Sequence, residues 1–258
     1  MSVHPEHHAL AAEVARWFTA STPEIGRDVH EFWYGYHCNL GPDRARVTLR
    51  MEDPDQLATA LRDARTASEK RHLTIRVDNR DRAARLDAAL RDYGCQPGDA
   101  ITHLALVGPM TGRAGPEDLV IESIDEARLE EWATVKLQAF HETESAPAFD
   151  RLRGEVETRR GELAIAECQI GMLGGENVAV LAYYRGTDQM VFNLATRTPY
   201  RHRGIAQTML ARWVDAGIAN GCRSLMINAT DGGRAAALYR SLGFTDEIYW
   251  YRTYELGR

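Results

Sequence analysis

A short basic segment, Arg201-His202-Arg203-Gly204, combines residue types that can bind an anion. It follows an apolar stretch, Met190–Thr196, that predicts a strand. Thr198-Pro199 ends this strand, because proline cannot donate to a sheet ladder. From Ile205 onward apolar residues recur at helical spacing. Since the first N–H groups of a helix lack internal partners and carry partial positive charge, this order of elements predicts a phosphate-binding turn.

The side chains of the turn support the same interpretation. Gly204 allows the backbone to approach a phosphate closely, and Arg201 and Arg203 can donate charge-assisted hydrogen bonds. The alternative is a solvated surface turn that binds nothing. The turn is neither the G-x-G-x-x-G dinucleotide fingerprint nor a G-K-[ST] loop, since neither pattern occurs in the chain.

The spacing Arg201-x-x-Gly204-x-Ala206 resembles the R/Q-x-x-G-x-G/A signature of the GNAT acyltransferase superfamily. The loop of that signature holds the pyrophosphate of acyl-coenzyme A. Ala237–Phe244, A-L-Y-R-S-L-G-F, resembles a second segment common in the family. The resemblance extends over about residues 119–255 and implies a complete GNAT domain there.

The resemblance also implies roles for individual residues. The edge of the predicted strand would bind the pantetheine arm, the N–H groups after it would hold the pyrophosphate, and Tyr239 would protonate the departing thiolate. A tyrosine packed on a helix is the alternative for Tyr239. The implied cofactor-binding residues are Leu194, Ala195, Thr196, Arg201, His202, Arg203, Gly204, Ile205, Ala206, Gln207 and Asn228.

The resemblance assigns no general base, because both predicted strands of the site lack the carboxylate that many family members carry. His141, Glu142 and Glu144 lie in the loop where the family usually contacts its acceptor. Each is a candidate base, as is an ordered water, and each could equally face solvent. The candidate catalytic residues are therefore Tyr239, Glu142 and His141. An asparagine often found early in the family's last helix is replaced by Gly232-Gly233.

The chain length of 258 residues suits two domains. Gly108–Pro116 is rich in glycine and proline and predicts a linker. We therefore expect a first domain over 1–110 and a second over 117–258. A fold of the α/β class (α+β type), with a mixed central sheet and flanking helices, is expected for each.

A weak internal repeat suggests two tandem copies of one domain, although chance is the alternative. The strand and helix predicted at Leu73–Val77 and Asp81–Tyr93 match the order of those at Leu225–Ile227 and Gly233–Leu242. The first copy is expected to be degenerate. Where the second has its basic turn, the first has an acidic segment, Glu52-Asp53-Pro54-Asp55, and Leu90 stands where Tyr239 is expected.

The remaining predicted elements complete the pattern in both halves. Helices are expected over Ala9–Ala20, from Asp53-Pro54 to about Glu69, over a segment containing Leu129–Phe140 after Asp125 as its cap, and over Phe149–Arg160. Strands are expected at Arg46–Met51, Ile101–Val107, Leu119–Ile124, Leu163–Ala166, Val178–Tyr184, Ser224–Asn228 and Ile248–Tyr254.

Composition restricts the classes of function. A net charge of −6 and a pI near 5.9 argue against a nucleic-acid surface. The four cysteines form no C-x-x-C pair, and we expect reduced thiols and no metal. With no apolar run long enough to span a membrane and no signal peptide expected, we predict a soluble cytoplasmic protein, monomeric or homodimeric.

Together these features predict an acyl-coenzyme A-dependent N-acyltransferase, most simply one that moves acetyl from acetyl-coenzyme A to a primary amine of a small molecule. Direct attack in a ternary complex is the expected mechanism. The alternative is a module that binds acyl-coenzyme A as a sensor without turnover. The acceptor and the acyl chain length do not follow from the sequence.

Overall fold

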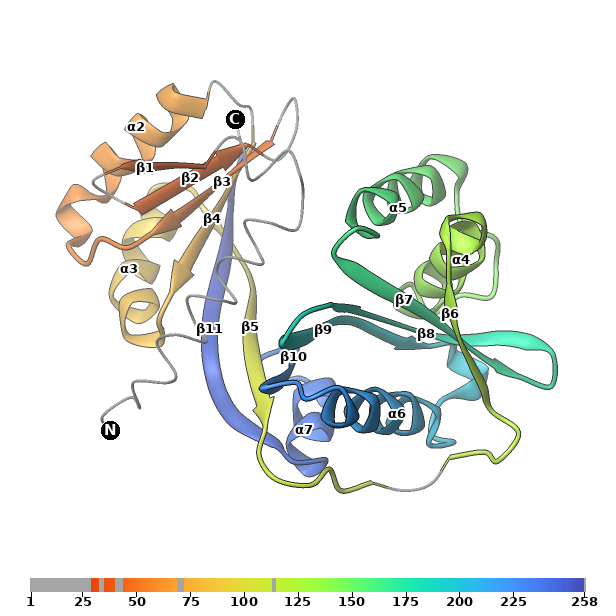
Figure 1. The fold of residues 1–258 in the computed structure, drawn as a ribbon. Coiled ribbons are helices and arrows are strands. Elements are labelled where there is room, and N and C mark those ends of the chain that lie inside the picture. The colour runs from red at the N-terminus through yellow and green to blue at the C-terminus, as the bar shows by residue number, and fades with distance from the viewer. Residues whose placement is uncertain (1–28, 33–34, 40–43, 69–71, 113–114, 258) are drawn as a thin grey trace. The chain divides into compact units, whose positions relative to one another are not determined.

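The computed structural model describes residues 29–32, 35–39, 44–68, 72–112 and 115–257 (Figure 1). The helix predicted over Ala9–Ala20 lies outside the described residues. Contacts divide the chain into two compact units. The first comprises Met1–His103, Ala229–Ala236 and Glu247–Arg258, and the second comprises Leu104–Asn228 and Ala237–Asp246. The first unit therefore includes residues from the end of the chain.

In the first unit the sheet order is β1-β2-β3-β4-β11. β1 pairs antiparallel with β2, and β2 pairs antiparallel with β3. β3 and β4 are parallel. The end of β11 runs antiparallel to β4, with Tyr251 opposite Asp78 and Leu256 opposite Leu73. The elements are β1 (Val29–Phe32), β2 (Gly35–Asn39), β3 (Arg44–Leu49), a 3-10 turn (Pro54–Gln56), α2 (Leu57–Ser68), β4 (His72–Asp78), α3 (Arg80–Asp92), β5 (Gln96–Leu106) and β11 (Phe244–Leu256).

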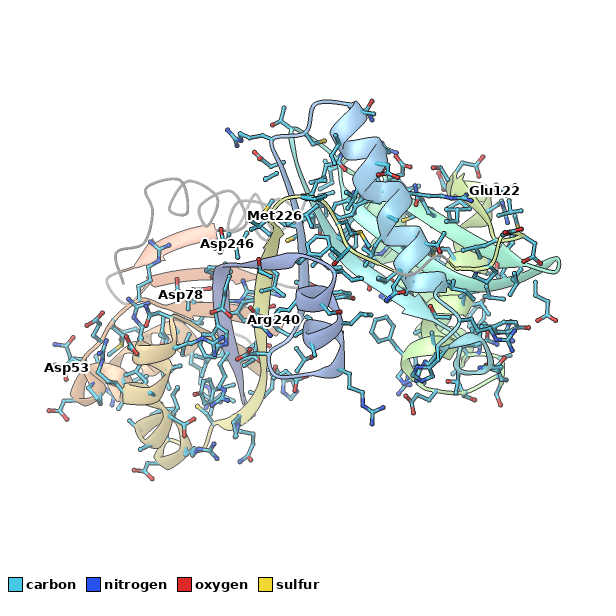
Figure 2. The ribbon with its side chains drawn as sticks, turned by 90° about the horizontal axis from the view of Figure 1, so that it is seen from below. Asp53, Asp78, Glu122, Met226, Arg240 and Asp246 are labelled. Carbon is cyan, nitrogen blue, oxygen red and sulfur yellow. The ribbon has the colours of Figure 1, made fainter. Side chains whose placement is uncertain are left out.

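The start of α2 is capped by a carboxylate side chain, that of Asp53. Asp53, marked in Figure 2, accepts a hydrogen bond from the backbone N–H of Asp55 at 3.0 Å and caps the 3-10 turn that leads into α2. Glu52 beside it pairs with Arg85 of α3 at 3.1 Å. The acidic segment noticed in the sequence is thus a helix cap and an anchor for α3.

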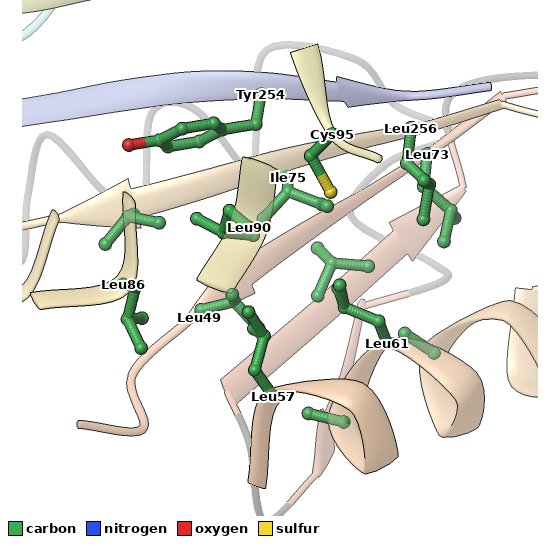
Figure 3. Close-up of a cluster of buried hydrophobic side chains, with 14 of the residues drawn as sticks. Leu49, Leu57, Leu61, Leu73, Ile75, Leu86, Leu90, Cys95, Tyr254 and Leu256 are labelled. Carbon is green, nitrogen blue, oxygen red and sulfur yellow. The ribbon is translucent and has the colours of Figure 1, made fainter. Parts of the chain in front are cut away.

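The core of the first unit is filled from α2, α3 and the sheet, and also from the chain's last strand (Figure 3). Leu57 and Leu61 of α2 and Leu90 of α3 pack there with apolar residues of β3 and β4. Tyr254 of β11 is fully buried in this cluster, and its hydroxyl donates to Asp87 of α3 at 2.8 Å. The last strand is therefore part of the first unit's core.

In the second unit the sheet order is β6-β7-β8-β9-β10. The first three pairs are antiparallel, whereas β9 and β10 are parallel. The elements are β6 (Val120–Ile124), a 3-10 turn (Glu126–Arg128), α4 (Leu129–Phe140), α5 (Phe149–Glu162), β7 (Ala166–Leu173), β8 (Glu176–Tyr184), β9 (Asp188–Thr196), a 3-10 turn (Thr198–Tyr200), α6 (Ile205–Ala219), β10 (Ser224–Thr230) and α7 (Arg234–Ser241).

Helices cover both faces of this second sheet. In Figure 1, α4 and α5 lie over one face and α6 lies against the other. Trp132 of α4 is fully buried against the first face, together with Ala182 of β8. Tyr183, the next residue on β8, contacts Trp213 of α6 with ring centroids 6.0 Å apart. Successive residues of β8 thus point to opposite faces, as the period of a strand requires.

The predicted fold class, a mixed sheet with flanking helices, is confirmed. The run β3-α2-β4-α3-β5 has the same order as β9-α6-β10-α7-β11, and each begins with a parallel strand pair. One strand prediction was wrong. Leu163, expected to begin this strand, is the C-cap of α5, and β7 begins only at Ala166. The hairpin β1–β2 was not predicted at all.

No described helix is both long and apolar enough to cross a membrane. Within the same described ranges, no cluster of histidine, cysteine, aspartate or glutamate side chains is arranged to hold a metal ion.

The position of Tyr254 predicts that the end of the chain stabilises the first unit. Replacing Tyr254 by Ala should lower the unfolding free energy by about 3–5 kcal/mol, as for other large buried side chains. Tyr254→Phe, which loses the hydroxyl's bond to Asp87 and its interaction with Arg252, should cost about 1 kcal/mol. Urea denaturation measures both, with Ile218→Ala as a control because Ile218 is 60% exposed.

Hydrogen exchange locates the effect. In Tyr254→Ala, amide exchange should rise in α3 but not in α4. Equal protection of both helices, or a rise confined to α4, would show that β11 does not support the first unit.

Candidate functional site

The parallel strands β9 and β10 stay together over only part of their length. Their ladder runs from Asp188 and Ser224 to Val191 and Ile227, and Figure 2 marks Met226 on β10 within it. Beyond this point β9 continues to Thr196, paired on its other side with β8. Among the described strands, none pairs with this edge of β9 beyond Val191. Such an edge can accept an extended ligand as an added strand.

A β-bulge marks the place where the strands part. Tyr183 of β8 pairs with Val191 and Ala182 pairs with Asn193, so Phe192 is an extra residue on β9. A bulge re-aims the backbone locally and leaves one residue unpaired. The stretch from Phe192 to Thr196 thus combines an unpaired edge with a redirected backbone. It includes Leu194, Ala195 and Thr196, three of the predicted cofactor-binding residues.

The basic turn joins β9 to the first turn of α6. His202 and Gly204 both have left-handed backbones, with φ of 62° and 80°. Gly204 is the N-cap residue, and no side chain of the described residues caps this helix. The first N–H groups of α6, from Ile205 to Gln207, therefore point out of the helix end with no side-chain acceptor. This differs from α2, whose entry is closed by Asp53. The turn can bind an anion through its backbone.

Gly115 packs directly on this turn. Its N–H donates to the hydroxyl of Thr208 at 3.0 Å, and that hydroxyl donates to the carbonyl of Gly204 at 3.1 Å. A Cβ on Gly115 would lie 2.2 Å from the Thr208 hydroxyl oxygen and 2.9 Å from the Gly204 carbonyl oxygen. The sequence predicts Gly115 only as part of a linker. No local pattern could have revealed a contact with a residue 93 positions away.

The side chain of Arg201 is already occupied by protein groups. Its Nε donates to the carbonyl of Thr196 at 3.1 Å, one terminal nitrogen donates to the carbonyl of Ala139 at 2.8 Å, and the other pairs with Glu142 at 2.6 Å. Arg203 differs, since it is exposed and lies over the ring of Tyr200, 5.3 Å from its centroid. The two arginines of the turn are therefore in different environments.

The candidate bases lie in the exposed loop between α4 and α5. Glu142 has a left-handed backbone, with φ of 51°, and its carboxylate is paired with Arg201. Glu144 pairs with Arg197. His141 has its Nε2 3.3 Å from a guanidinium nitrogen of Arg151. Each of the three side chains thus contacts an arginine. Two of these arginines, Arg197 and Arg201, flank the end of β9.

Tyr239 lies on α7 and is only 6% exposed. Its ring meets that of Phe244 edge to face, with centroids 6.4 Å apart. Burial raises the pKa of the phenol above its ordinary value, so it stays protonated at neutral pH. Asn228 follows Ile227, the last residue of β10 that pairs with β9. The hydroxyl of Thr196, at the end of β9, is buried without a hydrogen-bond partner among the described residues.

A family model described as the acetyltransferase (GNAT) domain matches residues 159–246. Residues 159–246 thus resemble a GNAT acetyltransferase domain. The match includes β9, the basic turn, α6, β10 and α7, which are the elements that carry the unpaired strand edge and the uncapped helix. A search of curated proteins found no match.

Solved structures of GNAT proteins have the same fold over most of the chain. A GCN5-related N-acetyltransferase from Kribbella flavida aligns with a TM-score of 0.62 and 18% identity and covers 95% of each chain. One from Sphaerobacter thermophilus gives 0.60 and 17%, covering 86% of this chain and 76% of that one. A tandem GNAT protein from the clavulanic acid biosynthesis pathway gives 0.59 and 14%, covering 86% and 78%. These likenesses establish a shared GNAT fold.

The packing of Gly115 predicts that a single methyl group added there will disturb the basic turn. Gly115→Ala should displace Thr208 and Gly204 and weaken the binding of coenzyme A about tenfold, a loss of about 1.4 kcal/mol of binding free energy. Isothermal titration calorimetry measures the dissociation constant.

The matched control is Gly154→Ala in α5, where a Cβ meets nothing within 4 Å. It should leave binding unchanged and raise the unfolding free energy by up to about 1 kcal/mol, because alanine is the better helix former. Equal binding in the wild type and in Gly115→Ala would show that this contact does not shape the turn.

Proposed function

We propose that the second unit transfers an acetyl group from acetyl-coenzyme A to a primary amine of a small molecule. The observation that carries the proposal is the continuity of the unpaired β9 edge with the uncapped start of α6. The β9 edge offers backbone hydrogen bonds to an extended amide-containing arm. The start of α6 offers N–H groups to the phosphates that follow that arm. Coenzyme A contains these two parts in this order.

In the proposed complex, Leu194, Ala195 and Thr196 bind the pantetheine arm, and the buried hydroxyl of Thr196 can take a hydrogen bond from it. The N–H groups of His202–Gln207 hold the pyrophosphate, and Arg203 adds its charge. We assign Asn228, just beyond the last pair of β10, to the same site. No metal is required, because the helix end and the basic turn supply the positive potential.

The proposed reaction is direct attack within a ternary complex. The amine nitrogen forms a bond to the thioester carbonyl carbon, and backbone N–H at the bulge of Phe192 stabilises the oxyanion. The carbon–sulfur bond then breaks, and Tyr239 donates its proton to the departing thiolate. A phenol that stays protonated suits this role, and it is regenerated by the proton that the amine gives up.

The amine must lose a proton before it attacks, and the loop after α4 is the proposed place for this. His141 or a water held by the loop accepts it. Glu142 and Glu144 are less suited, because each carboxylate already accepts from an arginine. The net charge of −6 is compatible with a cationic amine such as an amino sugar or a polyamine.

We also propose that the first unit is a degenerate, non-catalytic GNAT copy. Its β3 pairs with β4 along its whole length, Arg44–Leu49, so no free edge corresponds to that of β9. Asp53 occupies the helix entry where the second unit has an uncapped turn. A phosphate would be repelled there.

Calorimetry with acetyl-coenzyme A tests the proposal. We expect one molecule bound per chain, and we expect binding to be lost in Gly204→Glu, which puts a carboxylate at the helix start. Release of free thiol in the presence of a panel of amines then tests turnover. Two molecules per chain would contradict the degenerate first unit, and absence of binding would contradict the function as a whole.

The role of Tyr239 makes a separate prediction. Tyr239→Phe should lower kcat by about 10²–10³, the usual contribution of a general acid, with the dissociation constant of acetyl-coenzyme A within about twofold of the wild type. Steady-state kinetics and calorimetry give the two numbers. Tyr93→Phe, at the end of α3 in the first unit, is the control and should change neither. An unchanged kcat in Tyr239→Phe would exclude the proposed acid.

A further inference from the structure

We propose that Arg201 is a positioning residue that couples the basic turn to the loop between α4 and α5, and that it is not a ligand of the pyrophosphate. Residues 141–148 are called the acceptor loop here. The inference rests on the proposed function, because it assigns different roles in that site to Arg201 and Arg203. Its evidence is the set of contacts that Arg201 makes.

The guanidinium of Arg201 joins three segments. It donates to Thr196 at the end of β9, to Ala139 in the last turn of α4 and to Glu142 in the acceptor loop, at 3.1, 2.8 and 2.6 Å. The last carbonyls of a helix have no internal donor, and a cation is favoured at that end. Arg201 therefore caps α4 and fixes where the acceptor loop begins.

The backbone of Glu142 gives independent support. Its φ of 51° lies in the left-handed region, which residues other than glycine adopt at an energetic cost. Such a conformation persists where surrounding contacts over-determine it. The pair with Arg201 is one such contact. Without it, we expect the backbone at Glu142 to relax and the acceptor loop to change its conformation.

A second set of contacts ties the same loop to the start of the turn. Arg197 pairs with Glu144, and it also donates to the carbonyl of Asn177 at 3.1 Å. Gln138 of α4 donates to the carbonyl of Glu144 at 3.1 Å. The segment from Arg197 to Arg201 thus contacts the loop at two points. A ligand that fixes this segment therefore also fixes the loop.

Arg203 is the better phosphate ligand of the two arginines. It is exposed, its guanidinium rests on the ring of Tyr200, and within the described chain it has no carboxylate at ion-pairing distance. Three of the five N–H donors of Arg201 are already used by protein acceptors, and its charge is paired with Glu142, so Arg201 is less suited than Arg203 to a phosphate. We therefore assign the charge contact to Arg203 and the coupling to Arg201.

The experiment compares Arg201→Met, Glu142→Gln and Arg203→Met. Calorimetry with coenzyme A should show a loss of about five- to tenfold in affinity for Arg203→Met, as expected for one charged phosphate contact. Arg201→Met and Glu142→Gln should stay within about twofold of the wild type. Both should accelerate amide exchange in the acceptor loop, and the double variant should show no further increase.

Kinetics supply a readout that a purely structural role would not move. With glucosamine or spermidine as acceptor probes, Arg201→Met and Glu142→Gln should each raise the acceptor KM about fivefold or more with a smaller change in kcat. Arg201→Lys should restore part of this loss, since lysine keeps the charge for Glu142 but cannot make three directed contacts.

Two outcomes overturn the proposal. One is a loss of coenzyme A affinity in Arg201→Met equal to that in Arg203→Met, with Glu142→Gln unchanged, which would make Arg201 a phosphate ligand. The other is unchanged exchange of the acceptor loop in both Arg201→Met and Glu142→Gln. Absence of coenzyme A binding in the wild type would contradict the proposed function instead, and the exchange data would still decide the coupling. Glu142→Gln keeps the side chain's size, so its effect cannot be attributed to lost side-chain volume.

Discussion

In the second unit, part of the backbone of β9 lacks the hydrogen-bond partners that a strand needs. Buried backbone groups need hydrogen-bond partners, yet β9 extends beyond the end of its ladder with β10. The edge from Phe192 to Thr196 is exposed at one side, and a few residues later the first N–H groups of α6 also lack a side-chain cap. Both unmet requirements lie on one continuous stretch of chain. A ligand with amide groups followed by phosphates can satisfy both. Binding such a ligand would supply the hydrogen-bond partners that this part of the backbone lacks.

The first unit shows what the same order of elements looks like when these requirements are met internally. Its β3 is paired with β4 from end to end, and Asp53 accepts from the N–H at the helix entry. The side chain that closes this entry is the one that would repel a phosphate. The difference between the two units thus comes from strand length and one capping residue, while the order of strands and helices is shared. This is why a fold comparison alone could not assign the site to one unit.

The sequence predicted the elements whose patterns are local. The strand before the basic turn, the helix after it and the cap at Asp125 are confirmed, because alternation, helical spacing and capping act over a few residues. The strand β7 was placed too early in the prediction because Leu163, an apolar residue at the end of α5, was taken as its start. The bulge at Phe192, the contact of Gly115 with the turn and the contacts of Arg201 were not predicted. Each depends on residues far apart in the chain, and a residue type alone does not show which partner it has.

The arginine pairs also change how the loop carboxylates are understood. In the sequence, Glu142 and Glu144 were candidate bases because they lie where an acceptor amine would approach. In the structure each accepts from an arginine that flanks the end of β9, so its oxygens are engaged in holding the loop. An acidic residue near a reacting group can therefore act by fixing geometry, without taking a proton. If the loop is held in this way, effective catalysis needs only a modest proton acceptor, because correct placement of the amine against the thioester removes most of the entropic barrier to attack. The one carboxylate of β9, that of Asp188, lies at the end of the strand away from the bulge and pairs with Arg223. The absence of a carboxylate from Met190–Thr196 and from β10 is then compatible with an enzyme.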